Sequence, residues 1–190
     1  TVKEGGFKKC VALAAKKSQK NSYFGPKQFD NIWNVFAHAQ TTAPELENAL
    51  KINKLGNLDV FIAGCGTGGT VMGFYHYFSE FSPNKSKKND LKVYPILPDK
   101  NEDGKHRIEG IGDSFIPKIV DLQALSPVLR IKDSDAMNIA RQINKLGLSV
   151  GISSGANVFG AILKASMLPS KSNVSTILCD GNKKYLSTDL

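Results

Sequence analysis

The sequence predicts an α/β fold built on an open, mostly parallel sheet flanked by helices. Short, nearly continuous apolar runs, which are typical of buried parallel strands, alternate with helical patterns from residue 58 to the end of the 190-residue chain. Glycine-rich turns at 64–70 and 151–157 each follow such a run. The composition, 41% hydrophobic and 22% charged, can form a buried core and excludes a disordered chain.

Two helices are expected before the first strand. In residues 7–15 apolar positions recur at helical spacing and lysines occupy the other face, which indicates an amphipathic surface helix. The segment Thr42–Glu45 (Thr-Ala-Pro-Glu) is typical of a helix start with a capping box, and Gly56 is expected to end that helix. Residues 58–63 then form the first predicted strand, and a helix over about 71–78 follows its glycine turn.

The second half of the chain continues the alternation, with strands expected at 91–97, 128–131, 148–150 and 174–178. A helix capped by Asp133 or Ser134 is predicted to end at Gly147. Another is expected to run from the turn at 151–157 to about Leu168. Ligands of such sheets bind beyond the carboxyl ends of the strands, which is where both glycine turns fall.

Charge and composition exclude several classes of protein. The net charge is +8, but its lysine clusters, in residues 1–30 and 85–88, are not interleaved with aromatic residues, so nucleic-acid binding is not expected. Apolar runs fall far short of the roughly 20 residues that cross a bilayer, and residues 1–6 do not form a secretory signal. We expect neither membrane insertion nor secretion.

Neither the cysteines nor the histidines form a recognisable site. The wide spacing of Cys10, Cys65 and Cys179 fits no disulfide framework and no zinc motif, which favours a reducing, cytoplasmic setting. The histidines, at 38, 76 and 106, share no ligand spacing, so surface or interface positions are expected and metal binding is not. Trp33 is expected in the core or at a dimer contact.

The turn Gly64–Thr70 (Gly-Cys-Gly-Thr-Gly-Gly-Thr) is a candidate anion site. Free amide groups and the dipole at a helix start attract phosphate, glycines allow close approach of the backbone, and Thr67 and Thr70 add hydroxyl donors. The turn also satisfies the GxGxxG pattern of dinucleotide sites, which by itself is weak. Because Asp99 lies 30 residues beyond Gly69, rather than about 20, a monophosphate such as that of pyridoxal phosphate fits better. A tight turn without a ligand is the remaining alternative.

Several segments, in order and spacing, resemble the cysteine synthase family, the fold type II pyridoxal-phosphate enzymes that include cystathionine β-synthase. They are residues 28–31 (Gln-Phe-Asp-Asn), 41–45 (Thr-Thr-Ala-Pro-Glu), 59–70 (DVFIAGCGTGGT), 106–117 (HRIEGIGDSFIP), 151–156 (GISSGA) and 185–188 (YLST). The resemblance covers nearly the whole chain. It implies pyridoxal 5′-phosphate as cofactor, an amino-acid substrate and a homodimer.

The resemblance also implies roles for particular residues. The cofactor phosphate would be bound by Gly66, Thr67, Gly68, Gly69 and Thr70. Ser153 would hydrogen-bond the ring nitrogen, although a helix N-cap is the alternative for this serine. Gln28, otherwise an ordinary loop residue, would orient the substrate carboxylate or the ring oxygen, and Gly110 and Ile111 would face the substrate.

The implied reaction is β-elimination or β-replacement on sulfur amino acids through an aminoacrylate. It would convert O-acetylserine and sulfide into cysteine, or cysteine into hydrogen sulfide plus serine. A neutral serine at the ring nitrogen gives a weaker electron sink than a carboxylate does, which suits elimination rather than transamination. Two alternatives stay open: an NAD(P)-dependent dehydrogenase that uses the GxGxxG pattern, and a non-catalytic relative of the family.

The sequence departs from the family pattern in three places. Asp113 stands where many members have a small residue, and could act as a base that promotes sulfide release, or be a loop carboxylate. Residues 178–182 read Leu-Cys-Asp-Gly-Asn where the family has Leu-Pro-Ser-Ser-Gly, so Cys179 and Asp180 are expected near the ring and weaken the argument from the neutral Ser153. The family's Schiff-base lysine has no counterpart in a matching motif. We therefore expect the C-terminal part of a longer enzyme, with residues 1–30 ending a small substrate-closing domain and 31–190 in the large cofactor domain.

Overall fold

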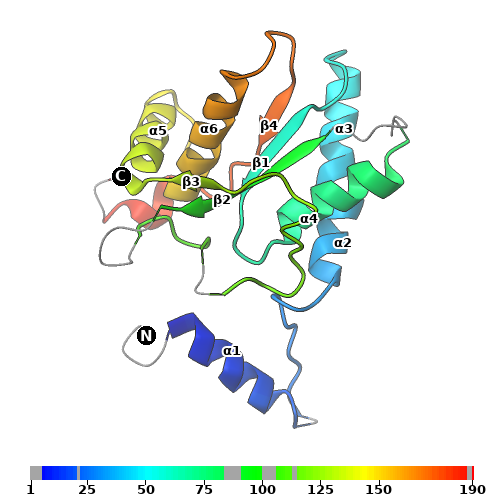
Figure 1. Ribbon diagram of the computed structural model, residues 1–190. Coiled ribbons are helices and arrows are strands. Elements are labelled where there is room, and N and C mark those ends of the chain that lie inside the picture. The colour runs from blue at the N-terminus through cyan, green and yellow to red at the C-terminus, as the bar shows by residue number, and fades with distance from the viewer. Residues whose placement is uncertain (1–5, 21, 84–90, 100–105, 113–114, 188–189) are drawn as a thin grey trace.

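The structure is a computed structural model that describes residues 6–20, 22–83, 91–99, 106–112, 115–187 and 190. Its centre is a four-stranded sheet of β1 (Val60–Gly64), β2 (Lys92–Pro98), β3 (Leu129–Ile131) and β4 (Val174–Thr176). The strand order is β3-β2-β1-β4, and every neighbouring pair is parallel (Figure 1). The predicted α/β class with a parallel sheet is confirmed.

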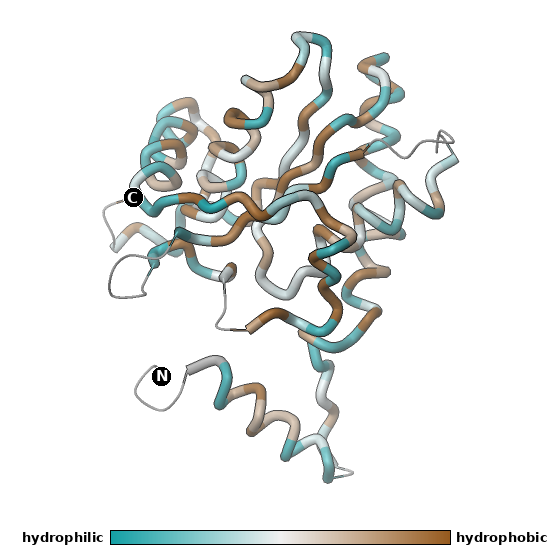
Figure 2. The backbone as a smooth tube through the Cα atoms, viewed as in Figure 1, coloured by the Kyte–Doolittle hydropathy of each residue, from teal (hydrophilic) through white to brown (hydrophobic). Residues whose placement is uncertain are grey.

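Helices cover both faces of this sheet (Figure 1). On one face lie α2 (Trp33–Gln40), α3 (Thr42–Ile52) and α4 (Gly69–His76); on the other lie α5 (Asp133–Lys145) and α6 (Ile152–Ala165). Alternate residues of β1 enter the two cores, because successive side chains of a strand point to opposite faces. Phe61 stacks on Phe74 of α4 with ring centroids 3.5 Å apart, whereas Ile62 packs in the α5–α6 layer. In Figure 2 the strands are coloured mostly as apolar, whereas the helices mix apolar and polar residues.

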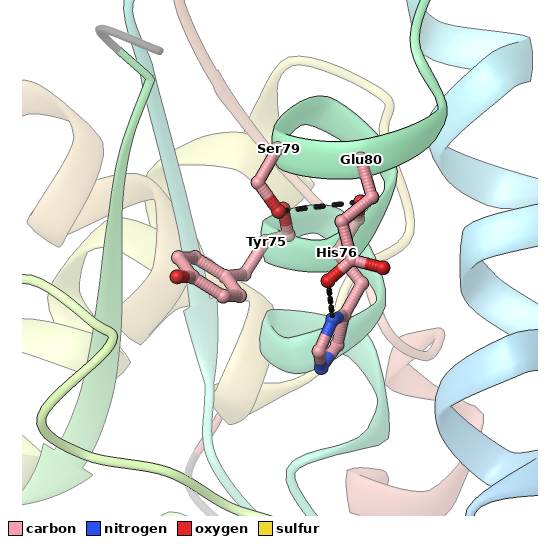
Figure 3. A network of polar contacts seen from close by, with 4 residues as sticks. All are labelled: Tyr75, His76, Ser79 and Glu80. Atoms are coloured by element: carbon pink, nitrogen blue, oxygen red, sulfur yellow. Dashed lines mark hydrogen bonds and ion pairs between the residues drawn. The ribbon is translucent and has the colours of Figure 1, made fainter.

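Helix α4 continues into a π-helical turn, Tyr77–Phe81, where the predicted helix was expected to end. His76 Nδ1 lies 2.8 Å from Glu80 Oε1, and Ser79 Oγ donates to the carbonyl of Tyr75 at 2.7 Å (Figure 3). These local bonds accompany the wider turn, which places Phe78 in the same core as Phe74.

The predicted strand at 148–150 does not form. The amide of Val150 donates to Asn144 Oδ1, and its carbonyl accepts from Asn144 Nδ2, each at 3.0 Å. One side chain at the end of α5 therefore occupies both backbone groups that a sheet ladder would need. The sequence pattern could not show this competition, because an apolar tripeptide is compatible with both arrangements.

Two expectations about helix starts are also wrong. Thr41, not Thr42, is the N-cap of α3, and no capping side-chain bond forms there. The N-cap of α5 is Lys132, while the carboxylate of Asp133 accepts from the Arg107 amide at 2.7 Å. Trp33 is 68% exposed, so of its two expected positions the core is excluded and the dimer contact stays a prediction. Helix α2, which begins at Trp33, was not expected from the sequence.

The N-terminal helix α1 (Gly6–Lys17) lies apart from the sheet and its helices (Figure 1). As predicted, it is helical, but all its described side chains are exposed, including the apolar Val11 and Leu13. Among the described residues, no helix combines the length and the apolar character required to cross a membrane.

Candidate cofactor site

The glycine turn between β1 and α4 is shaped by a left-handed residue. Gly68, the N-cap of α4, has φ +87°, a conformation that glycine adopts without steric cost. A Cβ on Gly68 would overlap the side chain of Val120. The turn is therefore compact, and it presents the amides of the first turn of α4, which have no partners within their own helix. Such a helix start attracts anions.

Two neighbouring segments press against this turn. A Cβ on Gly66 would overlap the carbonyl of Gly110, and one on Gly69 would overlap the amide of Asn34. The amide of Gly112 also donates to the carbonyl of Cys65 at 3.2 Å. The structure thus brings together the two segments that the sequence predicted for phosphate and substrate.

Gly110 and Ile111 differ in burial. Gly110 is exposed and has φ +81°, so its backbone is free to face a ligand. Ile111 is 7% exposed and packs in the α5–α6 core, against Gly64. Its side chain serves the core, so only its backbone can face a substrate. Asp113, the predicted base, lies outside the described residues.

Thr67 is held by the side chain of Asn34. Asn34 Nδ2 donates to Thr67 Oγ1 at 2.9 Å and to the carbonyl of Gln28 at 2.9 Å, and the Gly69 amide also donates to Thr67 Oγ1 at 3.3 Å. Because the oxygen of Thr67 already accepts two bonds, its hydroxyl proton is left to donate elsewhere. Gln28 joins the site through its main chain, while its side chain is exposed.

Thr70 contacts His38, which the sequence placed at a surface or interface position. His38 Nε2 lies 3.2 Å from Thr70 Oγ1, and His38 Nδ1 lies 3.0 Å from Thr42 Oγ1. Desolvation by burial lowers the pKa of His38 below its ordinary value, which favours a neutral ring. Of the two positions expected for this histidine, surface or interface, the half-buried ring does not fit the first. Its position one helical turn after Asn34 was the available signal.

The second glycine turn starts α6 and holds Ser153. Gly151 is the N-cap, so Ser153 is not the cap that the sequence offered as an alternative. Ser153 is buried, 6% exposed, and hydrogen-bonds the sulfur of Cys179. The pKa of Cys179 is raised chiefly by desolvation, and the bond from Ser153 opposes that shift. The neighbouring Ser154 Oγ accepts from the Cys179 amide at 2.8 Å.

Asn157, which the sequence analysis did not single out, links the two turns. It is fully buried; its Oδ1 accepts from the Gly64 amide at 2.8 Å and its Nδ2 donates to the Ile177 carbonyl at 2.8 Å. One side chain on α6 thus fixes the ends of the adjacent strands β1 and β4. The signal was a polar residue on the apolar face of a predicted helix.

Asp180 lies beside the start of α6. The Gly151 amide donates to its carbonyl at 2.9 Å, and Asp180 Oδ2 accepts from the Tyr185 hydroxyl at 3.1 Å. Burial and the nearby carboxylate raise the pKa of Tyr185 to about 12. Asp180 Oδ1 is buried and has no hydrogen-bond partner among the described residues. The two departures at 179 and 180 are therefore in contact with the turn that carries Ser153.

These features fit a phosphate monoester. At positions 66, 68 and 69 a Cβ would overlap the segments packed around residues 66–70, the turn we call the cup, so only glycine allows the turn to keep this shape. The Thr67 oxygen already accepts two hydrogen bonds, which leaves its proton for an anion. A parallel α/β sheet with this cup at one helix start and a buried serine at the next glycine turn has the features of a binding domain for a phosphorylated cofactor.

The comparisons specify the family. The sequence pattern of the family described as pyridoxal-phosphate dependent enzymes matches residues 1–180, so the chain belongs to that family. It is 42% identical over 170 residues to cysteine synthase B of Campylobacter jejuni, covering 88% of this chain and 54% of that protein. It is 33% identical over 191 residues to a cysteine synthase of Staphylococcus aureus, covering 97% of this chain and 59% of that protein.

Solved structures of related enzymes are also similar to this chain. A hydrogen sulfide-producing enzyme from Fusobacterium nucleatum matches with TM-score 0.88 and 40% identity, over 98% of this chain and 56% of that one. The O-acetylserine-dependent cystathionine β-synthase of Helicobacter pylori matches with TM-score 0.77 and 33% identity, over 97% and 58%. The chain spans between 54% and 59% of the length of these four relatives.

Proposed function

We propose that this chain forms most of the cofactor domain of a pyridoxal-phosphate enzyme that carries out β-elimination or β-replacement on sulfur amino acids. The observation that carries the proposal is the cup at residues 66–70, with its glycines at positions of close approach and its threonine hydroxyls. Family membership and the cysteine synthase relatives support it. The dehydrogenase alternative has no counterpart among these relatives.

We assign each group of site residues a role in binding the cofactor or the substrate. The amides at 66–70 and the hydroxyls of Thr67 and Thr70 hold the phosphate. The Ser153 hydroxyl, which bonds the sulfur of Cys179 in this structure, donates to the ring nitrogen when its one proton turns away from that sulfur. Bound pyridoxal phosphate supplies the electron sink that acidifies the α-proton of an amino acid. Gln28 and the backbone at 110–111 orient the substrate. We assign the Schiff-base lysine to the part of the longer protein that these residues do not include.

The leaving group distinguishes two versions of this function. A cysteine synthase uses O-acetylserine and sulfide, whereas a cysteine lyase releases hydrogen sulfide from cysteine. In the sequence Asp113 directly follows Gly112, and the amide of Gly112 donates to the carbonyl of Cys65 in the first glycine turn. A carboxylate at this point of the chain can take a proton from water, so we propose that Asp113 is a catalytic base that favours sulfide release.

We also propose a homodimer in the cytoplasm, with residues 1–30 as the end of a small substrate-closing domain. An exposed aromatic group on α2, where the Trp33 and Phe36 rings lie 5.6 Å apart, supports a contact surface. The separation of α1 from the sheet supports the domain division (Figure 1).

The intact gene product tests the proposal. It is expected to be yellow, to lose its colour on reduction with borohydride, and to be stabilised against heat by pyridoxal phosphate but not by NAD or NADP. A colourless product that NAD stabilises would contradict the proposal. Comparing sulfide release from cysteine by the wild type and by Asp113→Ala tests the base; equal rates would remove Asp113 from the mechanism.

A further inference from the structure

His38 lies between two hydroxyl groups, so its tautomer decides what each hydroxyl can do. Thr70 Oγ1 lies 3.2 Å from Nε2, and Thr42 Oγ1 lies 3.0 Å from Nδ1. Burial lowers the pKa of His38, which keeps the ring neutral, and a neutral ring donates from one nitrogen and accepts at the other. The direction of both bonds is therefore set together.

The two tautomers have opposite consequences for Thr70. If Nε2 accepts, the single hydroxyl proton of Thr70 is used by the ring, and Thr70 presents only lone pairs to the cup. If Nε2–H donates, Thr70 accepts that bond and keeps its proton for an anion. A phosphate offers acceptor oxygens, so only the second arrangement lets Thr70 contribute a bond.

Helix α2, which carries His38, already provides such a donor to Thr67. Asn34 donates to Thr67 Oγ1, and the direction is fixed because the same Nδ2 also donates to the Gln28 carbonyl, which can only accept. Asn34 and His38 are one turn apart on α2, and each reaches one of the two threonines of the cup. The helix is also close to α4, since a Cβ on Gly73 would lie 2.5 Å from His38 Cβ.

We propose that His38 is a positioning residue held as the Nε2–H tautomer by a hydrogen bond from the Thr42 hydroxyl to Nδ1, and that it thereby makes Thr70 a donor to the cofactor phosphate. This inference rests on the proposed function, since it requires a phosphate in the cup. Thr42 is then a specificity element outside the cup, with no contact to the ligand.

Substitutions at Thr42 test the inference in the intact gene product freed of cofactor. The probe is pyridoxine 5′-phosphate, which carries the phosphate but no aldehyde, with unphosphorylated pyridoxine as reference, both measured by calorimetry. Thr42→Val keeps the shape and loses the donor, and should weaken binding of the phosphorylated probe roughly 3- to 10-fold, the value of one net hydrogen bond. Thr42→Ser should bind as the wild type does.

Thr41→Val is the matched control, because Thr41 is adjacent and its hydroxyl bonds only the local helix, at the Ala37 carbonyl and near Thr42. It should leave the affinity unchanged. If the wild type binds the phosphorylated probe and Thr42→Val binds it equally well, the inference fails while the proposed function stands. If the wild type binds no better to the phosphorylated probe than to pyridoxine, both fail.

Nitrogen-15 spectra of histidine-labelled protein read the tautomer directly, with a His38→Gln spectrum to assign the signals. We expect Nε2 protonated and Nδ1 unprotonated in the wild type, and a loss of that preference in Thr42→Val. A wild-type ring protonated at Nδ1 would overturn the inference even if every variant bound the probe.

Discussion

The side-chain amide of Asn34 donates to the hydroxyl oxygen of Thr67 over 2.9 Å, although 33 residues separate the two in the sequence. This bond ties α2 to the first glycine turn. It also consumes an acceptor site on Thr67 and leaves the proton of that hydroxyl free. A helix that makes no backbone contribution to the cup therefore determines how the cup binds an anion.

Asn34→Asp replaces the donor with a carboxylate oxygen facing two acceptors. We expect affinity for pyridoxine 5′-phosphate to fall on the order of tenfold, because a donor is lost and a negative charge is placed near the anion. Calorimetry on the intact gene product measures it. Asn31→Asp is the control, since the half-buried Asn31 bonds the Pro26 carbonyl and the Trp33 amide rather than the cup; equal losses in the two variants would contradict the assigned role.

Gly68→Ala and Gly147→Ala separate strain from site geometry. Both glycines have left-handed backbones, with φ +87° and +89°, so each alanine costs about 1 kcal/mol of stability in strain. Only at Gly68 would the added Cβ also overlap a neighbour, Val120; at Gly147 nothing lies within 4 Å. We expect Gly68→Ala to abolish phosphate binding and Gly147→Ala to preserve it, as judged by cofactor retention on gel filtration.

Asn157→Asp should destabilise the protein and disturb the site together. Its amide joins Gly64 to Ile177, and a carboxylate would oppose the Ile177 carbonyl in a fully buried position. We expect the free energy of unfolding in urea to fall by about 3 kcal/mol. Asn144→Asp is a matched control, because Asn144 also accepts from an amide and donates to a carbonyl, both of Val150, and bonds no residue of the cup. It should cost stability but leave cofactor affinity unchanged.

The buried thiol of Cys65 predicts a loss of stability in alkali. Burial raises the pKa of Cys65 to about 11, from an ordinary value near 9. The folded protein then holds its proton where the unfolded chain has lost it, so stability present below pH 9 falls as the pH rises to about 11. The expected loss is on the order of 3 kcal/mol. In urea denaturation at each pH, Cys65→Ala should lack this decline; an unchanged decline would assign it to other groups.

Much of the fold could be predicted from the sequence. Nearly continuous apolar runs identified β1 and β2, and alternation with helical patterns gave the parallel sheet. The failures have a common cause. The expected strand at 148–150 is prevented by a side chain, Asn144. Thr42 does not cap α3 because Thr41 is the N-cap, and the Thr42 hydroxyl instead lies 3.0 Å from His38 Nδ1. Local patterns cannot show a side chain that arrives from another element.

Only part of the site could be predicted, again because local patterns do not show contacts between distant elements. The glycine turn and Ser153 carry local signals, and the structure places them at the starts of two helices joined by Asn157. Asn34, His38 and Asn157 were missed as site residues because their partners lie between 32 and 93 residues away. Only the fold brings such pairs into contact.

A crystal structure of the intact gene product with pyridoxal 5′-phosphate tests the central claim most directly. The phosphate should accept hydrogen bonds from the main-chain amides at 66–70 and from the hydroxyls of Thr67 and Thr70, with the ring nitrogen at Ser153. A phosphate bound elsewhere, or this cup holding the pyrophosphate of a nucleotide, would contradict the account.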